Sequence, residues 1–247
     1  MKRLLDFLIA TCALLAFTPL LAAVAIAVWL EDRNSPWYRG VRVGLGGREF
    51  RMLKFRSMRA GAAKTGVNST AAGDARITRV GRFLRALKLD ELPQLWNVVT
   101  GEMSLVGPRP QVPEDASLYT DEERWMLEVR PGITDLASIV FSDEGEILAG
   151  NADPDLLYNQ IIRPWKSRLA LLYIDSSSWV IDVRILLWTA GALVSRRWAI
   201  RRVGKLLDDW GVVDPLRSVA RREAPLPAYP PPGAHAVVAR YRVSTTC

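Results

Sequence analysis

Residues 87–110 read LKLDELPQLWNVVTGEMSLVGPRP, and the rest of the chain can be understood by how it serves this stretch. Two adjacent carboxylates, Asp90 and Glu91, stand just before Pro93. Proline disfavours helical geometry in the residue before it and is well accommodated in the first turn of a helix. We therefore expect the pair at a helix junction, where backbone N–H groups can receive anionic oxygens.

The two carboxylates are expected to have different roles, because neighbouring helical residues point about 100° apart. A carboxylate can attack phosphorus as a covalent nucleophile if cations neutralise the repulsion between it and the phosphate. Mg²⁺ usually takes one or two protein carboxylates together with substrate phosphate oxygens. One hypothesis is therefore that Asp90 attacks and Glu91 holds Mg²⁺. The other is that the pair is an ordinary solvated helix start, and the residue types alone leave both open.

The segment before the pair predicts a basic amphipathic helix over residues 77–89, because apolar and basic residues alternate at helical spacing. The apolar positions are Ile77, Val80, Phe83, Leu84 and Leu87, and the basic ones are Arg76, Arg79, Arg82, Arg85 and Lys88. Further upstream, residues 41–58 are typical of a β-hairpin with glycines at its turn. Residues 60–73 predict a loop.

The N-terminal run from Phe7 to Leu30 carries no charge and indicates contact with a membrane. At about 1.5 Å per residue it could reach across a hydrocarbon core of roughly 30 Å. It is longer than the apolar region of a cleaved signal peptide. Both flanks are basic, which suits a helix whose two ends face the same side. Pro19 follows Thr18 and can kink the helix, so a spanning helix and a re-entrant helix both remain open.

The segments after Pro110 are mostly helical in pattern. Glu114–Val129 predicts an exposed acidic helix that ends before a proline-glycine stop. Residues 136–141 are strand-like, followed by a turn near 143–145. Residues 156–173 predict a helix broken at Pro164.

The C-terminal third contains two further features. Trp179–Ala199 is apolar but interrupted by charge, and its tryptophans and arginines favour an interfacial helix over a second membrane span. An ordinary core helix with a basic end is the alternative. The proline-rich segment from Glu223 onward predicts disorder.

Composition narrows the partners and the chemistry. The chain has 247 residues, is 49% hydrophobic and carries a net charge of +7, so it can bury a core and attract anionic partners. Nucleic acid is disfavoured because the basic residues are not interleaved with aromatic ones in a single-strand platform. The two cysteines lie at opposite ends and His235 is the single histidine, so no thiol or histidine metal site is predicted. Catalysis would use carboxylates, lysines, arginines, hydroxyls or a hard cation.

The two blocks Leu89–Val98 and Gly101–Pro110 closely resemble the bacterial sugar transferase family, in particular its small monotopic polyprenyl-phosphate phosphoglycosyl transferases. The likeness covers roughly residues 2–197. Further matches are the sequence KFRSM at 54–58, Arg85, RPGIT at 130–134 and the Thr18-Pro19 pair. After Thr134 many members continue with a Gly-Leu-Ala-Gln-Val-Asn-Gly-Arg type run, whereas this chain has DLASIVF at 135–141. That departure bears on the choice of sugar.

The resemblance implies an enzyme on the cytosolic face of the bacterial inner membrane. It would transfer a phospho-sugar from a UDP-sugar to polyprenyl phosphate, with undecaprenyl phosphate expected, and release UMP. This is the first membrane step in the assembly of exopolysaccharide, capsule, O-antigen or glycoprotein glycans. Asp90 would form a covalent phosphosugar intermediate and Glu91 would help to hold Mg²⁺. The N-terminal helix would be re-entrant and broken at Thr18 and Pro19.

The expected substrate-binding residues are Lys54, Arg56, Arg85, Gln94, Arg109 and Arg130. Membrane phospholipids and downstream glycosyltransferases are the further expected partners, and no nucleic acid is expected. The alternative function is a catalytically inactive, membrane-bound scaffold of a glycan assembly complex.

The expected fold is α+β and mainly helical. Residues 1–38 would form the re-entrant membrane helix and its exit. Residues 39–215 would form a cytosolic catalytic domain with a short β-hairpin and interfacial amphipathic helices. Residues 216–247 would be a disordered, proline-rich tail.

Overall fold

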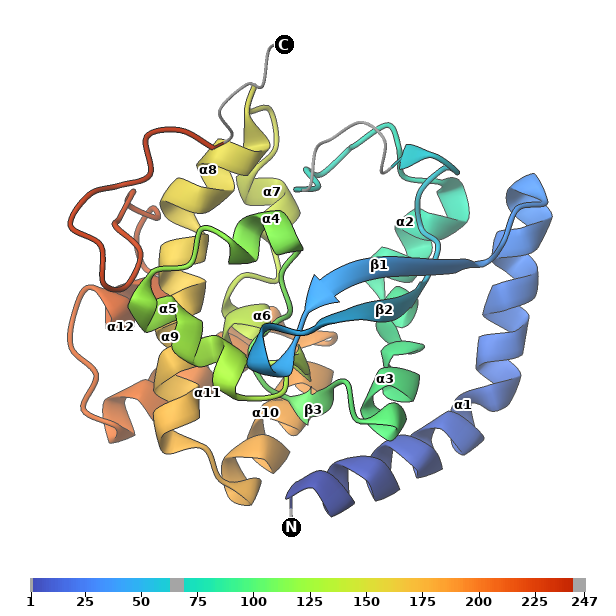
Figure 1. The fold of residues 1–247 in the computed structure, drawn as a ribbon, viewed down its shortest axis with the longest axis horizontal. Helices are drawn as coiled ribbons and strands as arrows, with labels where there is room; N and C mark the ends of the chain where they lie inside the picture. The colour runs from blue at the N-terminus through green and yellow to red at the C-terminus, as the bar shows by residue number, and fades with distance from the viewer. Residues whose placement is uncertain (1, 63–68, 242–247) are drawn as a thin grey trace.

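The long helix α1, Lys2–Asp32, runs along one edge of the computed structural model, which describes residues 2–62 and 69–241. Figure 1 shows that α1 bends near its middle, so that its first half passes α3 and its second half rises past α2. Pro19 lies inside the helix, and the Thr18 hydroxyl donates to the Leu14 carbonyl at 2.8 Å. A proline and a hydroxyl bonded one turn back are recognised causes of a helix bend.

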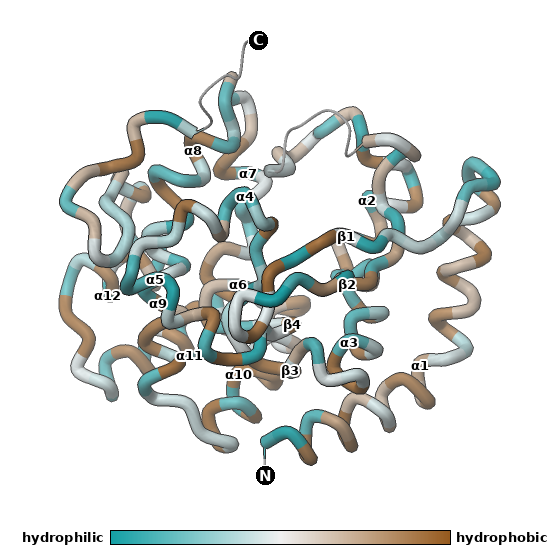
Figure 2. Tube along the Cα trace, in the orientation of Figure 1, coloured by the Kyte–Doolittle hydropathy of each residue, from teal (hydrophilic) through white to brown (hydrophobic). Residues whose placement is uncertain are grey.

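Most of the apolar surface of α1 faces away from the protein. Figure 2 shows hydrophobic residues along most of its length and hydrophilic ones at its two ends. Its most apolar 18-residue window is only 11% buried. Among the described residues it is the one helix that is long and apolar enough to cross a membrane, judged by length and composition.

The N-terminal half of α1 is fixed to the folded body by polar contacts. Arg3 donates to the carbonyls of Val98 and Val99, at 2.8 Å for the latter. The buried carboxylate of Asp6 accepts a hydrogen bond from the Ser104 hydroxyl at 2.6 Å. These contacts hold the start of α1 against α3 (Gln94–Thr100) and β3 (Ser104–Val106).

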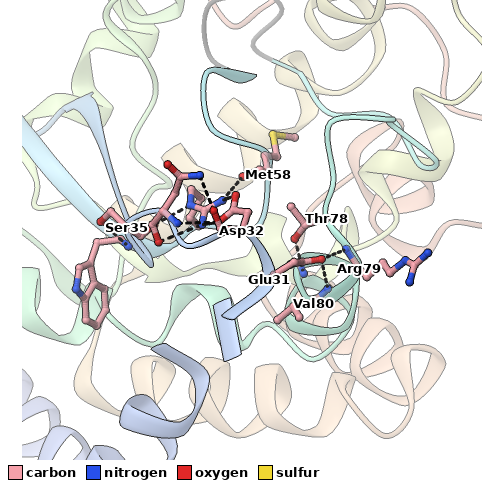
Figure 3. A network of polar contacts seen from close by, with 11 residues as sticks. Glu31, Asp32, Ser35, Met58, Thr78, Arg79 and Val80 are labelled. Atoms are coloured by element: carbon pink, nitrogen blue, oxygen red, sulfur yellow. Dashed lines mark hydrogen bonds and ion pairs between the residues drawn. The ribbon is translucent and has the colours of Figure 1, made fainter. Parts of the chain in front are cut away.

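The C-terminal end of α1 is fixed to the same body. Glu31 accepts hydrogen bonds from the backbone N–H groups of Arg79 and Val80, at 2.8 and 3.3 Å, in the first turn of α2 (Arg79–Ala86). Asp32 forms a bidentate ion pair with Arg56, with both distances 2.6 Å. Figure 3 shows these two acidic residues with the groups around them. Both ends of the long helix therefore lie on one folded unit.

The predicted β-hairpin is confirmed, with β1 (Trp37–Val43) antiparallel to β2 (Glu49–Phe55). The turn contains Gly46 and Gly47 at φ of 65° and 72°, values that favour glycine. Alternate residues of a strand share a face, so Lys54 lies on the same side of β2 as the buried Phe50 and Met52. The hairpin thus directs Lys54 toward the interior of the site.

The carboxylate pair lies at the predicted helix junction. It occupies the 3-10 turn η3, Leu89–Glu91, and α3 follows after Pro93. The basic helix before it is shorter than predicted, because α2 ends at Ala86. Lys88 has a left-handed backbone, with φ of 57°, and this conformation turns the chain out of α2 and into η3.

Two short parallel strands bring distant segments together. β3 (Ser104–Val106) pairs with β4 (Gly132–Thr134), with Ser104 opposite Gly132. A Cβ atom on Gly132 would lie 2.1 Å from the backbone nitrogen of Gly107. Only glycine permits this approach, which places the 130–134 segment beside the turn that carries Arg109.

The predicted acidic helix over Glu114–Val129 is wrong. The segment forms three short pieces: α4 (Pro113–Ala116), α5 (Asp121–Arg124) and the 3-10 turn η4 (Trp125–Glu128). A capping box at Thr120 starts α5 afresh. Glu123 is fully buried and paired with Arg163, so the segment is not simply an exposed acidic face.

The predicted strand over residues 136–141 is also wrong, because the segment forms the helix α6, Leu136–Val140. Asp135 caps this helix by accepting a hydrogen bond from the Ser138 backbone N–H at 2.6 Å. A short apolar run fits a strand and a buried helix equally well, and the N-cap decides between them here.

The remaining helices are α7 (Glu144–Ile147), α8 (Pro154–Ile161), α9 (Arg163–Ser176), α10 (Trp179–Ala192), α11 (Arg196–Asp209) and α12 (Leu216–Arg221). The predicted break at Pro164 is confirmed, because α8 ends and α9 begins there. The segment Trp179–Ala199 is divided between α10 and α11 by a Ser195 cap. The chain is mainly helical, and the described residues contain two small two-stranded sheets.

The C-terminal segment differs from the disordered tail that its prolines predict. As far as Tyr241, it lies along α8 and α9. The Tyr229 ring packs on Trp165 at 4.5 Å between centroids, and Arg168 donates to the Pro230 carbonyl at 2.9 Å. The Tyr241 hydroxyl donates to Asp115. Residues 242–247, and 63–68 of the predicted loop, lie outside the described residues.

Candidate active site

Asp90 is almost completely buried, with 7% of its surface exposed. Its carboxylate accepts no hydrogen bond from residues 2–62 or 69–241. Burial raises the pKa of Asp90, and the negative charge of Glu91 raises it further, while the charge of Lys54 opposes the rise. A buried carboxylate without a hydrogen-bond donor has its oxygens available for reaction.

Glu91 has the opposite surroundings. Lys54 donates to one of its oxygens at 2.9 Å, and Arg109 donates to both, at 3.2 Å for the pair formed by Nη1 and Oε2. Burial alone would raise the pKa of Glu91, but the charges of Arg109 and Lys54 outweigh it and hold that pKa well below its usual range. Adjacent carboxylates with pKa values pushed apart are typical of a division of roles.

The two cations respond to the same contacts. The charge of Glu91 raises the pKa of Arg109, which therefore stays charged. Burial lowers the pKa of Lys54, although Glu91 partly restores it. The four groups Lys54, Asp90, Glu91 and Arg109 come from β2, η3 and the turn after β3, and they form one charged cluster.

The other predicted site residues are distributed between this cluster and its surroundings. Arg85, in the last turn of α2, lies close enough for its charge to lower the pKa of Asp90. Gln94 is fully buried, and neither atom of its side-chain amide has a hydrogen-bond partner in the described parts of the chain. A buried polar group without a hydrogen-bond partner is unfavourable, so the side-chain amide of Gln94 is available to hydrogen-bond a bound ligand.

Two predicted substrate-binding residues are used elsewhere in this structure. Arg56 is held by Asp32 and by the Ser35 carbonyl, at 2.7 Å for the latter, so it fixes the exit of α1. Figure 3 shows Asp32 and Ser35 at this exit. Arg130 donates to the Gly101 carbonyl at 2.9 Å. Gly101 follows the end of α3 that is opposite the carboxylate pair, about 10 Å away at the rise of an α-helix. The structure does not bring either arginine into the charged cluster.

A pocket adjoins Arg109 and contains groups that the sequence did not single out as site residues. Its volume is about 450 Å³ with its open mouth included. Asp135, Ser138, Tyr158 and Lys166 are among its lining residues. Lys166 is paired with Glu144, whose pKa is lowered because the charge of Lys166 outweighs the effect of burial. The departure from the family pattern at 135–141 was the one signal for this region, and nothing in the sequence pointed to Lys166.

The charged cluster contains two carboxylates that could act as ligands of Mg²⁺. The described residues contain no group of three or more His, Cys, Asp or Glu side chains arranged to hold a metal. Mg²⁺ does not need such a cage, since it is commonly bound by one or two carboxylates and substrate phosphates. The strongly acidic Glu91 beside Asp90 fits that donor set, although Lys54 or Arg109 would share or yield an oxygen.

The arrangement suits a reaction at an anionic phosphate. The buried carboxylate of Asp90, which accepts no hydrogen bond from the described residues, lies beside two cations that Glu91 holds in place. Arginine and lysine placed in this way can neutralise phosphate oxygens while a nucleophile approaches.

Comparison with known proteins gives consistent relatives. A UDP-glucose:undecaprenyl-phosphate glucose-1-phosphate transferase of Caulobacter vibrioides is 43% identical over 141 residues, which is 56% of this chain and 53% of the relative. A UDP-N-acetylgalactosamine-undecaprenyl-phosphate N-acetylgalactosaminephosphotransferase of Aeromonas hydrophila is 41% identical over 142 residues, or 56% of this chain and 34% of the relative. The exopolysaccharide production protein ExoY of Sinorhizobium fredii is 40% identical over 153 residues, covering 56% and 68%.

The chain thus spans about half of the length of the first of these relatives and about a third of the second. The family described as bacterial sugar transferase matches residues 1–196, which include α1, the hairpin, the carboxylate pair and α10. Because this match covers most of the chain and contains the whole charged cluster, the protein belongs to the bacterial sugar transferase family.

Proposed function

We propose that this protein transfers a phospho-sugar from a UDP-sugar to polyprenyl phosphate, giving polyprenyl-diphosphate-sugar and UMP. The names of the relatives support this class of reaction, and undecaprenyl phosphate is the lipid that those names print. The observation that carries the proposal is the contrast within the carboxylate pair. Asp90 is buried without a hydrogen-bond donor, and Glu91 is held by Lys54 and Arg109.

The proposed reaction has two steps at one phosphorus atom. An oxygen of Asp90 forms a bond to the phosphorus that carries the sugar, and the bond from that phosphorus to the bridging oxygen breaks, so UMP leaves with the electron pair. An oxygen of polyprenyl phosphate then attacks the same phosphorus, and the carboxylate of Asp90 leaves. Arg109, Lys54 and Arg85 neutralise the phosphate oxygens during both steps.

We also propose that Mg²⁺ binds at Glu91 together with the diphosphate of the donor. When bound, the ion would supply further neutralisation of the phosphate charge. The support is the low pKa of Glu91, which keeps its carboxylate ionised and able to act as a ligand. Loss of UMP release in chelator, restored by added Mg²⁺, is the expected result. Full activity in the chelator would exclude this part of the proposal.

We place the enzyme on the cytosolic face of the bacterial inner membrane, with α1 as a re-entrant helix. Crossing the bilayer would separate the two ends of α1 by a hydrocarbon core of about 30 Å. The contacts of Arg3 and Asp6 at one end and of Glu31 and Asp32 at the other support ends on the same side.

A second helix supports contact with phospholipids. On α10, exposed apolar side chains recur at helical spacing, at Trp179, Val183 and Leu187. Lys2, at the start of α1, forms an ion pair with Asp182 of α10. This stripe would therefore rest on the same membrane surface as the start of α1.

The topology can be tested with single cysteines at positions 2 and 33, in protein whose two native cysteines have been changed to serine. A membrane-impermeant thiol reagent should label both positions from the cytosolic side. Labelling from opposite sides would refute the re-entrant arrangement.

The chemistry can be tested with Asp90→Asn and Glu91→Gln. Each should abolish UMP release from UDP-sugars, and only Asp90→Asn removes the attacking atom. Without the lipid acceptor, wild-type protein should gain the mass of one phospho-sugar, and the Asp90→Asn protein should not. Asp121→Asn, at a fully exposed carboxylate, is the matched control and should behave as wild type. Turnover by the Asp90→Asn protein would refute the covalent mechanism. Glycan production in cells that carry this variant would favour the inactive scaffold.

A further inference from the structure

The pocket beside Arg109 contains polar groups that the phosphate chemistry leaves unused. Ser138 has a buried hydroxyl without a hydrogen-bond partner among the described residues. Asp135 uses one carboxylate oxygen to cap α6, and its second oxygen accepts nothing from the described residues. A buried hydroxyl and a free carboxylate oxygen on one short segment provide one hydrogen-bond donor and one acceptor for a ligand.

The rest of the pocket wall combines aromatic and polar character. Gln111 donates to the Tyr158 hydroxyl at 3.3 Å, and Lys166 lies over the Tyr158 ring at 5.4 Å. Burial raises the pKa of Tyr158, so its hydroxyl stays protonated and can donate. Few, fixed polar groups among apolar surfaces are typical of small-molecule sites, and the residues that line this pocket have that mixed character.

The pocket is connected to the reacting centre through one side chain. Arg109 lines the pocket and also holds Glu91. The charge of Asp135 acts on Arg109, which places the pocket wall close to the charged cluster. A group attached to the phosphate at Asp90 could therefore extend past Arg109 into the pocket.

The composition of a neighbouring hollow helps to identify the ligand. This second hollow, of about 270 Å³ with its open mouth included, also borders Arg109. The residues that only it contributes are apolar: Val43, Gly44, Pro110, Ala116, Leu127, Val129 and Pro131. It therefore offers fewer groups that could distinguish one pattern of hydroxyls from another.

We propose that the pocket binds the hexose ring of the sugar donor, and that Ser138 and Asp135 are the residues that determine which sugar is accepted. This inference rests on the proposed function, because the sugar is placed by its phosphate at Asp90. Ser138 exchanges hydrogen bonds with one ring hydroxyl, and Asp135 accepts from another. Sites built to bond a particular hydroxyl reject analogues that lack it far more strongly than apolar pockets do.

The test uses Ser138→Ala and Asp135→Asn in the full-length protein. Asparagine keeps the helix cap of Asp135 and removes its charge. Ser138→Ala removes a hydroxyl that has no partner within the protein, so its thermal stability should not fall. Ser117→Ala is the control, because its hydroxyl is exposed and bonds only the Glu114 carbonyl.

Two measurements are needed. The first is kcat/KM for UMP release from UDP-glucose, UDP-N-acetylglucosamine and UDP-N-acetylgalactosamine, and the second is calorimetric binding of these donors and of UMP. We expect wild-type protein to bind its best donor more tightly than UMP. Each pocket variant should change the preference among donors by about tenfold or more. UMP binding should stay the same.

The outcomes separate this inference from the proposed function. Donor preference that is unchanged in both variants would overturn the pocket assignment while UMP release by wild type still supports the transferase. Weakened UMP binding in the same proportion as donor binding would overturn it too, because the pocket would then hold the nucleoside. Tight donor binding that depends on Ser138 without any UMP release would uphold the pocket and refute the transferase.

Discussion

Replacement of Lys54 by methionine should move the pH dependence of the reaction in a direction that the structure fixes. The charge of Lys54 lowers the pKa of Asp90, against the effect of burial. Without that charge, the pKa of Asp90 rises further, and a smaller fraction of this proposed nucleophile is ionised at neutral pH. The acidic limb of the rate profile should therefore shift to higher pH.

The cost to stability follows from the ion pair between Lys54 and Glu91. At 2.9 Å, with only 16% and 14% of the two side chains exposed, their attraction is about 6 kcal/mol at an effective dielectric constant near 20. Much of this is offset by the desolvation of both groups. Loss of one partner from a buried pair costs about 3–5 kcal/mol, and Arg109 remains on Glu91, so we expect the free energy of unfolding to fall by about 3 kcal/mol.

The assay is the rate of formation of the phosphosugar adduct, measured by rapid quenching between pH 5 and 9 without the lipid acceptor. Lys54→Arg keeps the charge and should retain most of the wild-type acidic limb. Lys205→Met, at an exposed lysine of α11, controls for the loss of one positive charge. An acidic limb of Lys54→Met that stays in place or moves to lower pH would refute the electrostatic reasoning.

Four further predictions concern stability. Asp90→Asn should raise the melting temperature near neutral pH, because the folded-state pKa of Asp90 is raised and its ionised form costs stability as pH rises through that range; a lowered melting temperature would contradict this. Glu91→Gln should destabilise the protein by about 3 kcal/mol at neutral pH. The difference from wild type should shrink as pH falls through the ordinary range of a glutamate and toward the depressed folded pKa of Glu91, and chemical denaturation at several pH values would measure this. Gly132→Ala should prevent the pairing of β3 with β4, because its Cβ would lie 2.1 Å from the Gly107 nitrogen, and should lower the free energy of unfolding by more than about 3 kcal/mol. The control is Gly150→Ala, which lies in open space at a positive φ and should lower the free energy of unfolding by only about 1 kcal/mol. Tyr229→Ala should lower the free energy of unfolding by roughly 2 kcal/mol through loss of packing on Trp165. An unchanged denaturation midpoint would show that the C-terminal segment does not pack against α9.

Local sequence patterns correctly predicted the elements that are set by residues close together in the chain. Pro93 marks the helix junction, the glycines near 46 mark the hairpin turn, and Pro164 separates α8 from α9. The predictions failed where burial decided the outcome. Glu123 belongs to an acidic run, yet its carboxylate is buried against Arg163, and no periodicity in the sequence reveals a partner 40 positions away.

The candidate site shows the same contrast between what local motifs predict and what contacts between distant segments decide. Asp90, Glu91 and Arg109 lie within one motif and were predicted together, and Lys54 was predicted from a second. Arg56 and Arg130 lie in matched motifs as Lys54 and Arg109 do, so the sequence does not distinguish them. In the structure the guanidinium group of Arg56 holds the exit of α1 and that of Arg130 holds the end of α3.

By itself, the sequence determined the chemical groups and the order in which they occur: an uncharged helix, a hairpin with a lysine, adjacent carboxylates at a helix start and an arginine turn. The tertiary structure alone decided which groups meet. Parallel pairing of β3 with β4, made possible by glycines that touch, places α6 and its Asp135 and Ser138 next to the Arg109 turn. Contacts between segments far apart in the chain set the burial of each carboxylate, and burial together with charge sets its pKa. This is why two neighbouring acids in the sequence become different groups in the folded protein.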